Sequence, residues 1–108
     1  MLRAGSRFED LYRSGARRRV GGLVVVSGPG RPGPPEVGIV AGRRVGNAVR
    51  RNRAKRRLRE AAAQVRLQPG TAYVLIAGPE AADVPFSRLV GWLERAVSAE
   101  SGAGEEDG

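Results

Sequence analysis

The segment from Arg43 to Arg59, RRVGNAVRRNRAKRRLR, constrains this chain most, because it is strongly charged and also periodic. It contains nine of the nineteen Lys and Arg residues and no Asp or Glu, which leaves ten basic and eleven acidic residues elsewhere. The formal net charge of +8 is therefore concentrated in this one segment. Closely placed cations release many counterions from a polyanion, so the segment predicts a polyanionic partner.

The periodicity of the same region predicts an amphipathic helix. At 3.6 residues per turn, its apolar and polar residues separate onto two sides. The apolar side holds Ala54, Leu58, Ala61, Ala62 and Val65, and the opposite side holds Asn52, Arg53, Arg56, Arg59 and Ala63. Asn47 is suited to the N-cap, and Pro69-Gly70 ends the element after Leu67. We expect a rod of about 30 Å with its apolar side in the core.

The remaining elements follow from shorter patterns. Ser6 and Glu9 form a possible capping box for a helix from about Arg7 to Arg13, closed by Gly15. The β-branched and apolar runs predict three strands, at 21–27, 37–41 and 71–77, and the Pro/Gly-rich stretch 27–36 predicts a loop. A last helix begins near Phe86 and Ser87, and its apolar spacing continues to Val97. Tyr73 and Trp92 lie in these strand and helix patterns and are predicted core residues.

Length and composition limit the organisation and the chemistry. A chain of 108 residues suits one domain, predicted here as residues 1–100, followed by an acidic and disordered tail, 101–108. The absence of Cys and His removes thiol nucleophiles, imidazole bases and the usual zinc ligands, so catalysis by this chain alone is disfavoured. No apolar run is long enough to span a bilayer, which predicts a cytoplasmic protein without a membrane partner.

A solvated charged helix is the ordinary interpretation of a basic run. It is disfavoured here because such a helix mixes signs, whereas nine like charges in one segment repel one another. Eighteen of the nineteen basic residues are Arg, whose planar fork suits phosphate contacts. No helix-turn-helix, zinc or zipper pattern is present, so RNA is favoured over DNA.

The residue order also resembles a known family. GRRVGNAVRRNRAKRRLREA, Gly42 to Ala61, is similar to the signature of the protein subunit of bacterial ribonuclease P. Four flanking segments fall in the family's order: RFEDLYRSG, VGIVAGRRVG, PGTAYVLIA and PFSRLVGWLERAV. The resemblance implies an α+β fold, a two-layer α-β sandwich of order α-β-β-β-α-β-α with a left-handed crossover around the Arg-rich helix. It also implies a further strand, which we expect within Val37 to Gly46.

For function, the resemblance implies an auxiliary subunit of an endoribonuclease whose catalyst is RNA. That RNA, with Mg²⁺ held mainly by the RNA subunit, would remove the 5′ leader from precursor tRNA to give the mature 5′ end. The protein would bind the catalytic RNA and the precursor tRNA, broaden the substrate range and lower the magnesium demand. No catalytic residue, metal ligand or small-molecule cofactor is expected on this chain.

The resemblance assigns two binding surfaces. The residues expected to bind the catalytic RNA are Arg43, Arg44, Asn47, Arg50, Arg51, Asn52, Arg53, Lys55, Arg56, Arg57 and Arg59. Those expected to bind the leader, in a cleft between the sheet and the first helix, are Phe8, Tyr12, Arg17, Arg18, Arg19, Leu23 and Val25. The family usually has aromatic residues in its first strand, where this chain has Leu23 and Val26. We therefore expect fewer stacked bases and more contacts from Arg17 to Arg19, and Phe8 fits the core equally well.

Two other functions remain open from the residues alone. A ribosomal or other structural RNA-binding protein could use the same Arg-rich helix. A protein nuclease would need clustered carboxylates for metal ions, and Glu9-Asp10 and Glu105 to Asp107 are poorly placed for that.

Overall fold

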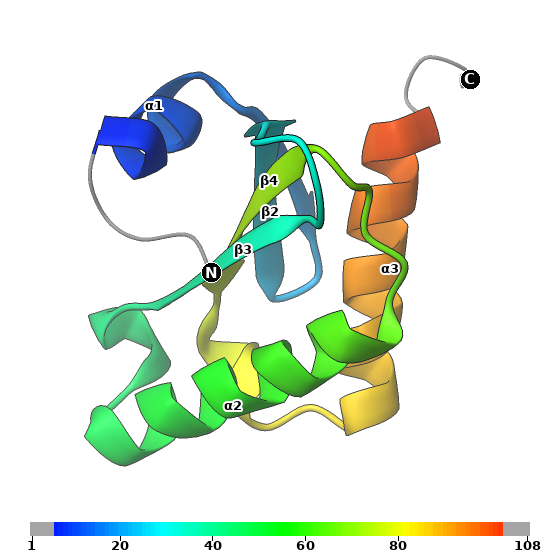
Figure 1. The fold of residues 1–108 in the computed structure, drawn as a ribbon. Coiled ribbons are helices and arrows are strands. Elements are labelled where there is room, and N and C mark those ends of the chain that lie inside the picture. Colours follow the sequence, from blue (N-terminus) through cyan, green and yellow to red (C-terminus); the bar gives the residue numbers. More distant parts are fainter. Residues whose placement is uncertain (1–5, 103–108) are drawn as a thin grey trace.

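The structure is a computed structural model that describes the backbone of residues 6–102 and the side chains of residues 10–98. Three helices pack on the two faces of one four-stranded sheet (Figure 1). The elements are α1 (Ser6–Ser14), β1 (Ala16–Val20), β2 (Leu23–Pro29), β3 (Glu36–Ala41), η1 (Arg43–Val45), α2 (Ala48–Gln64), β4 (Thr71–Ala77), η2 (Pro79–Ala82) and α3 (Phe86–Gly102), where η marks a 3₁₀ turn. This confirms the predicted α+β class and the order α-β-β-β-α-β-α.

The strand order in the sheet is β1-β2-β4-β3. β1 and β2 form an antiparallel hairpin, β2 pairs antiparallel with β4, and β3 pairs parallel with β4. Because β3 and β4 are parallel neighbours, the chain must cross over between them, and α2 is the main part of that crossover. The basic helix is thereby tied to the sheet at both ends.

The position predicted for the further strand was wrong. It is β1, ARRRV, and not a second part of Val37 to Gly46, where β3 ends at Ala41 and residues 43–45 form η1. β1 has four exposed residues followed by a half-buried Val20, so it carries no apolar alternation that a sequence pattern could detect. It lies at the edge of the sheet, where charged side chains are common because they prevent pairing with other chains.

The two faces of the sheet differ in what covers them. Leu23, Val25 and Leu75 face α2 and α3, and they form the larger core with Leu58 and Leu93. Residues of opposite parity, among them Val26 and Val74, form a smaller cluster with Leu11 of α1 on the other face. Figure 1 shows α1 and α3 on opposite sides of the sheet.

Several element boundaries moved by a few residues. α1 spans Ser6–Ser14, although the Ser6 and Glu9 side chains of the expected capping box lie outside the described residues. β2 continues to Pro29, so the predicted loop 27–36 shrinks to residues 30–35. α2 ends at Gln64 because Val65 adopts an extended conformation and is buried in the core.

The structure describes only the first part of the predicted tail, residues 101–108. α3 reaches Gly102, two positions beyond the expected end of the domain, and residues 103–108 of the acidic tail lie outside the described residues. No helix in the described part of the chain is long and apolar enough to cross a membrane.

Candidate nucleic-acid interface

The predicted division of α2 into two sides is confirmed. Ala54, Leu58 and Ala61 are fully buried against the sheet and α3, and Val65 follows them. Asn47 caps the helix as expected, because its side-chain oxygen accepts a hydrogen bond from the backbone N–H of Arg50 at 3.0 Å. The apolar side therefore fixes the orientation of the cations on the rest of the helix.

The structure separates the predicted RNA-binding residues into two groups by exposure. Arg43, Arg44, Asn47, Asn52, Arg53, Arg56 and Arg59 are exposed, whereas Arg50, Arg51, Lys55 and Arg57 are half-buried. Three of the half-buried side chains donate to backbone carbonyls of the protein itself. One of these is Arg51, whose guanidinium donates to the carbonyl of Gly46 at 3.0 Å. The exposed group is the part of α2 and η1 that an external anion can reach from solvent.

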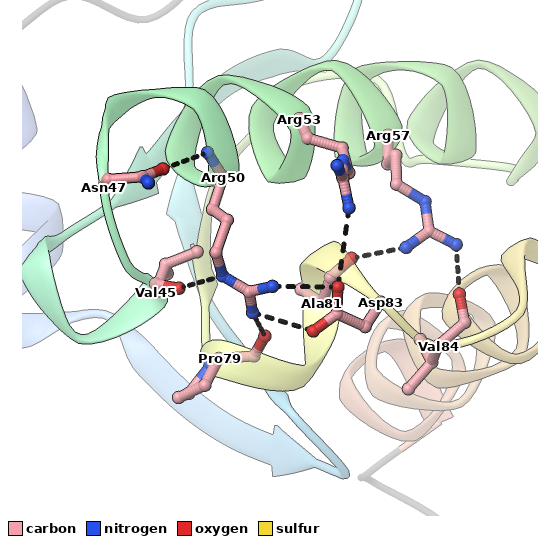
Figure 2. A network of polar contacts seen from close by, with 9 residues as sticks. All are labelled: Val45, Asn47, Arg50, Arg53, Arg57, Pro79, Ala81, Asp83 and Val84. Atoms are coloured by element: carbon pink, nitrogen blue, oxygen red, sulfur yellow. Dashed lines mark hydrogen bonds and ion pairs between the residues drawn. The ribbon is translucent and has the colours of Figure 1, made fainter.

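Arg50 is held by three acceptors on the segment before α2 and on the turn after β4 (Figure 2). Its Nε donates to the carbonyl of Val45 at 2.8 Å, and an Nη2 hydrogen bond of 3.1 Å reaches the carbonyl of Pro79. The same guanidinium forms an ion pair of 2.8 Å with Asp83. Arg50 therefore links η1, α2 and η2.

Arg57 has a similar role about two turns later along α2. Its guanidinium donates to the carbonyls of Ala81, at 3.0 Å, and Val84 (Figure 2). Together with Arg50 it pins residues 79–84 against the helix. Sequence reasoning could not find this role, because the partners lie 24 to 33 residues away along the chain.

Asp83 is the acidic residue of this network. Its carboxylate also lies 3.5 Å from the guanidinium of Arg53. The hydrogen bond from Arg50 lowers the pKa of Asp83, and the charges of Arg50, Arg53 and Arg57 act in the same direction. In return, the hydrogen bond to Asp83 raises the pKa of Arg50. Because Asp83 and Arg53 are exposed and Arg50 is only half-buried, the network orders the arginines more than it stabilises the fold.

A groove of about 500 Å³ lies on the sheet face that α2 and α3 do not cover. We call it the open-face groove. Its β-branched apolar residues are Val24, Val40 and Ile76, one from each of three neighbouring strands. Its polar rim includes Tyr12 of α1, Arg19 of β1, Arg43 and Arg44 of η1, and Glu80 of η2.

The open-face groove corrects two predicted leader contacts. Leu23 and Val25 are each 1 % exposed and belong to the core beneath α2 and α3, so their side chains cannot line an exposed surface. Alternate residues of a strand point to opposite faces, and Val24 takes the place predicted for them. Sequence reasoning missed Val24, Val40 and Ile76. The run 23–26 is apolar at every position, so it predicts a strand but does not say which residues face the helices.

The three arginines of β1 also divide between the two faces. Arg17 pairs with Val26 and Arg19 with Val24, which places both on the open face, whereas Arg18 pairs with Val25 and lies on the α3 side. The Arg17 guanidinium carbon lies 5.1 Å from the centre of the Tyr12 ring, and its Nη2 donates to the Tyr12 carbonyl at 2.7 Å. This cation–π contact orients a ring that is 40 % exposed.

Phe8 belongs to α1, but its side chain lies outside the described residues. Arg43 and Arg44 were assigned to the catalytic RNA, yet they also border the open-face groove. The two predicted binding surfaces therefore meet at η1 instead of lying apart.

Magnesium requires a set of oxygen ligands. Within the described residues, no group of three or more Asp, Glu, His or Cys side chains could hold a metal ion. The one carboxylate in the basic network, Asp83, is occupied by Arg50 and Arg53. The described side chains therefore do not fit a magnesium site built by the protein alone.

The sequence and the fold were compared with known proteins. Residues 1–99 match the family model Ribonuclease P. The ribonuclease P protein component of Kocuria rhizophila is 40 % identical over 99 residues, covering 90 % of this chain and 88 % of the relative. That of Ruegeria pomeroyi is 45 % identical over 99 residues, covering 84 % of this chain and 79 % of the relative.

The fold has a solved counterpart as well. The RNase P protein from Thermotoga maritima superposes with a TM-score of 0.79 at 25 % identity, covering 90 % of this chain and 96 % of that one. The similarity thus extends over the sheet, the three helices and the basic segment together. This chain belongs to the ribonuclease P protein family, the protein components of a tRNA-processing ribonucleoprotein.

Proposed function

We propose that this chain binds the RNA subunit of ribonuclease P through the exposed cations of α2, and that this RNA performs the hydrolysis. The observation that carries the proposal is the outward set Arg53, Arg56 and Arg59, opposite a side that is fully buried. Because the opposite side of α2 is buried, the helix cannot rotate about its axis. The three guanidiniums therefore lie along the solvent-facing side of the helix, where phosphates can contact them. Arg43 and Arg44 extend this row of cations at η1.

The 5′ leader of precursor tRNA is proposed to occupy the open-face groove. Tyr12 offers an exposed ring for stacking, and Arg19, Arg43 and Arg44 offer cations for the backbone of a single strand. The apolar floor of Val24, Val40 and Ile76 accepts any base, because it has no hydrogen-bonding group to select one. Such tolerance suits a protein that serves precursors with different leaders and broadens the substrate range.

Magnesium is proposed to be held mainly by the RNA. The protein would lower the magnesium demand by placing its own cations where the leader and the catalytic RNA approach each other. Since the described residues offer no carboxylate cluster, hydrolysis is assigned to the RNA and to its metal ions.

Reconstitution with the cognate RNA tests the proposal. Adding the protein should restore cleavage of a precursor tRNA at a magnesium concentration too low for the RNA alone. It should also increase affinity for leader-bearing tRNA over leaderless tRNA. Unchanged cleavage at every magnesium concentration would contradict the proposal. Metal-dependent cleavage by the protein without RNA would instead support a protein nuclease.

A further inference from the structure

A second groove follows the outer side of α3, on the part of the molecule that the function proposed above does not use. It has a volume of about 540 Å³ and is lined by Pro85, Ser87, Arg88, Gly91, Trp92 and Arg95. We call it the α3 groove. It shares no lining residue with the open-face groove, and α3 covers the opposite face of the sheet.

The spacing of its residues places two cations beside one aromatic ring. Arg88, Trp92 and Arg95 are separated by four and three positions, so they lie on one side of the helix. Both arginines are exposed, and in the described part of the chain neither is paired with a carboxylate. The space at Gly91, between them, is open, since a Cβ built there would meet no atom within 4 Å.

The ring of Trp92 is held in place from behind. A Cβ built on Gly21, in the turn between β1 and β2, would lie 2.1 Å from Cε2 of the indole, so the glycine backbone packs directly on the ring. The side chain is half-buried by this contact and contributes its remaining surface to the α3 groove. A ring fixed in this way loses little conformational entropy when a ligand stacks on it.

We propose that the α3 groove is a second binding site for single-stranded RNA, with a base stacked on Trp92 and phosphates bound by Arg88 and Arg95. Base stacking combined with flanking cations is the usual way to bind single strands without sequence preference. The two arginines are about 10 Å apart along the helix axis, a span that reaches beyond one nucleotide.

The position of the groove also favours RNA over an acidic peptide. It begins at Pro85, next to Val84, whose carbonyl is bound by Arg57 of α2. The α3 groove therefore adjoins the basic helix proposed to bind RNA, and a strand leaving that helix could continue into it. An acidic peptide would use the two cations but would gain nothing from a flat ring held between them.

The chain reports on this site directly, because Trp92 is its only tryptophan. Titrating the full-length protein with oligouridylate should quench the tryptophan fluorescence, and the affinity measured in this way should fall with salt. In Arg88→Gln/Arg95→Gln the affinity measured by quenching should fall about fivefold or more. The salt slope of this affinity should decrease by about 0.7 for each lost phosphate contact. The matched control is Arg31→Gln/Arg66→Gln, which removes two exposed arginines elsewhere and should retain the quenching curve of the parent.

A second variant tests base stacking with a signal that does not depend on the fluorescence of Trp92. Trp92→Leu, checked for its fold by circular dichroism, should bind a labelled oligouridylate at this site about 5- to 100-fold more weakly by fluorescence anisotropy.

Three results would overturn the inference. The first is that oligouridylate binds by anisotropy but does not quench the fluorescence of Trp92. The second is that quenching is equal in the two double variants. The third is that polyglutamate quenches more strongly than oligouridylate. The last would indicate an acidic protein partner. If oligouridylate quenches Trp92 but the protein does not stimulate precursor cleavage, the function proposed above is contradicted, whereas the binding site at the α3 groove is still supported.

Discussion

Gly21 shows how one residue connects the hairpin to a distant helix. Its φ of 57° is left-handed, and the Trp92 indole occupies the place where a side chain would lie. The turn between β1 and β2 has only two residues, Gly21 and Gly22, so it cannot move away without changing the register of the hairpin.

Gly21→Ala should therefore destabilise the protein by about 2–4 kcal/mol, because backbone strain and overlap with Trp92 act together. Gly70→Ala is the matched control, since Gly70 has a φ of 73° but no atom within 4 Å of a built Cβ. It should cost about 1 kcal/mol, from strain alone. Urea unfolding measures both, and an equal loss in the two variants would show that the Trp92 contact is unimportant.

The Asp83 carboxylate gives the protein a pH-dependent contribution to stability. Because the hydrogen bond from Arg50 lowers its pKa in the folded state, this contribution is present above the unfolded pKa of about 3.9. It is lost as the pH falls further, through the folded pKa. Asp83→Asn should thus lose less stability than the parent between about pH 5 and pH 3.

Thermal melts across this range test the assignment. Glu80→Gln removes another exposed carboxylate from the same segment, one that does not pair with Arg50, and should follow the curve of the parent. If Asp83→Asn and the parent lose stability in parallel, the ion pair does not contribute.

At the scale of elements, α2 divides its arginines between the protein and its surroundings. Arg53→Ala or Arg56→Ala should weaken binding of the catalytic RNA and reduce the salt slope by about 0.7–0.9 for each lost phosphate contact. Arg57→Ala should mainly reduce thermal stability, because it leaves the carbonyls of Ala81 and Val84 without their donor.

Arg66→Ala is the control for charge, because Arg66 is exposed but lies beyond the end of α2. Filter binding over a series of salt concentrations, together with thermal melts, separates the effects. Equal losses of RNA affinity in Arg53→Ala and Arg66→Ala would mean that only net charge matters.

α1 contributes to the open-face groove through Tyr12. Tyr12→Ala should reduce the preference for leader-bearing tRNA about 5- to 100-fold, with little change in binding of the catalytic RNA. Tyr12→Phe retains the ring and should retain most of the preference. Competition between leader-bearing and leaderless tRNA measures it, and a loss as large in Tyr12→Phe would assign the effect to the hydroxyl instead of to stacking.

For the molecule as a whole, the larger core determines where the basic surface points. Leu58 of α2 is fully buried between the sheet and α3, so it links both layers. Leu58→Ala should cost about 2–5 kcal/mol in urea unfolding. At a temperature where the variant is still folded, its affinity for RNA should remain near that of the parent. A large loss of RNA affinity in a variant that is still folded would mean that α2 had moved relative to the sheet.

Local sequence determined the elements whose own residues carry the signal. The bounds of β4, Thr71–Ala77, the Asn47 cap and the buried side of α2 are as predicted, because strand propensity, capping and helical periodicity depend on residues within a few positions. The match to the family signature likewise came from residues in their order along the chain.

Only the tertiary structure decided what depends on distant partners. Edge strand β1 forms by pairing with β2, although its own residues are almost all exposed. Arg50 and Arg57 turn inward because acceptors some thirty positions away meet them. The first four residues of β2 are all apolar, so the sequence does not distinguish its two faces. Only the packing of α2 and α3 on one face sends Leu23 and Val25 into the core and leaves Val24 in the open-face groove.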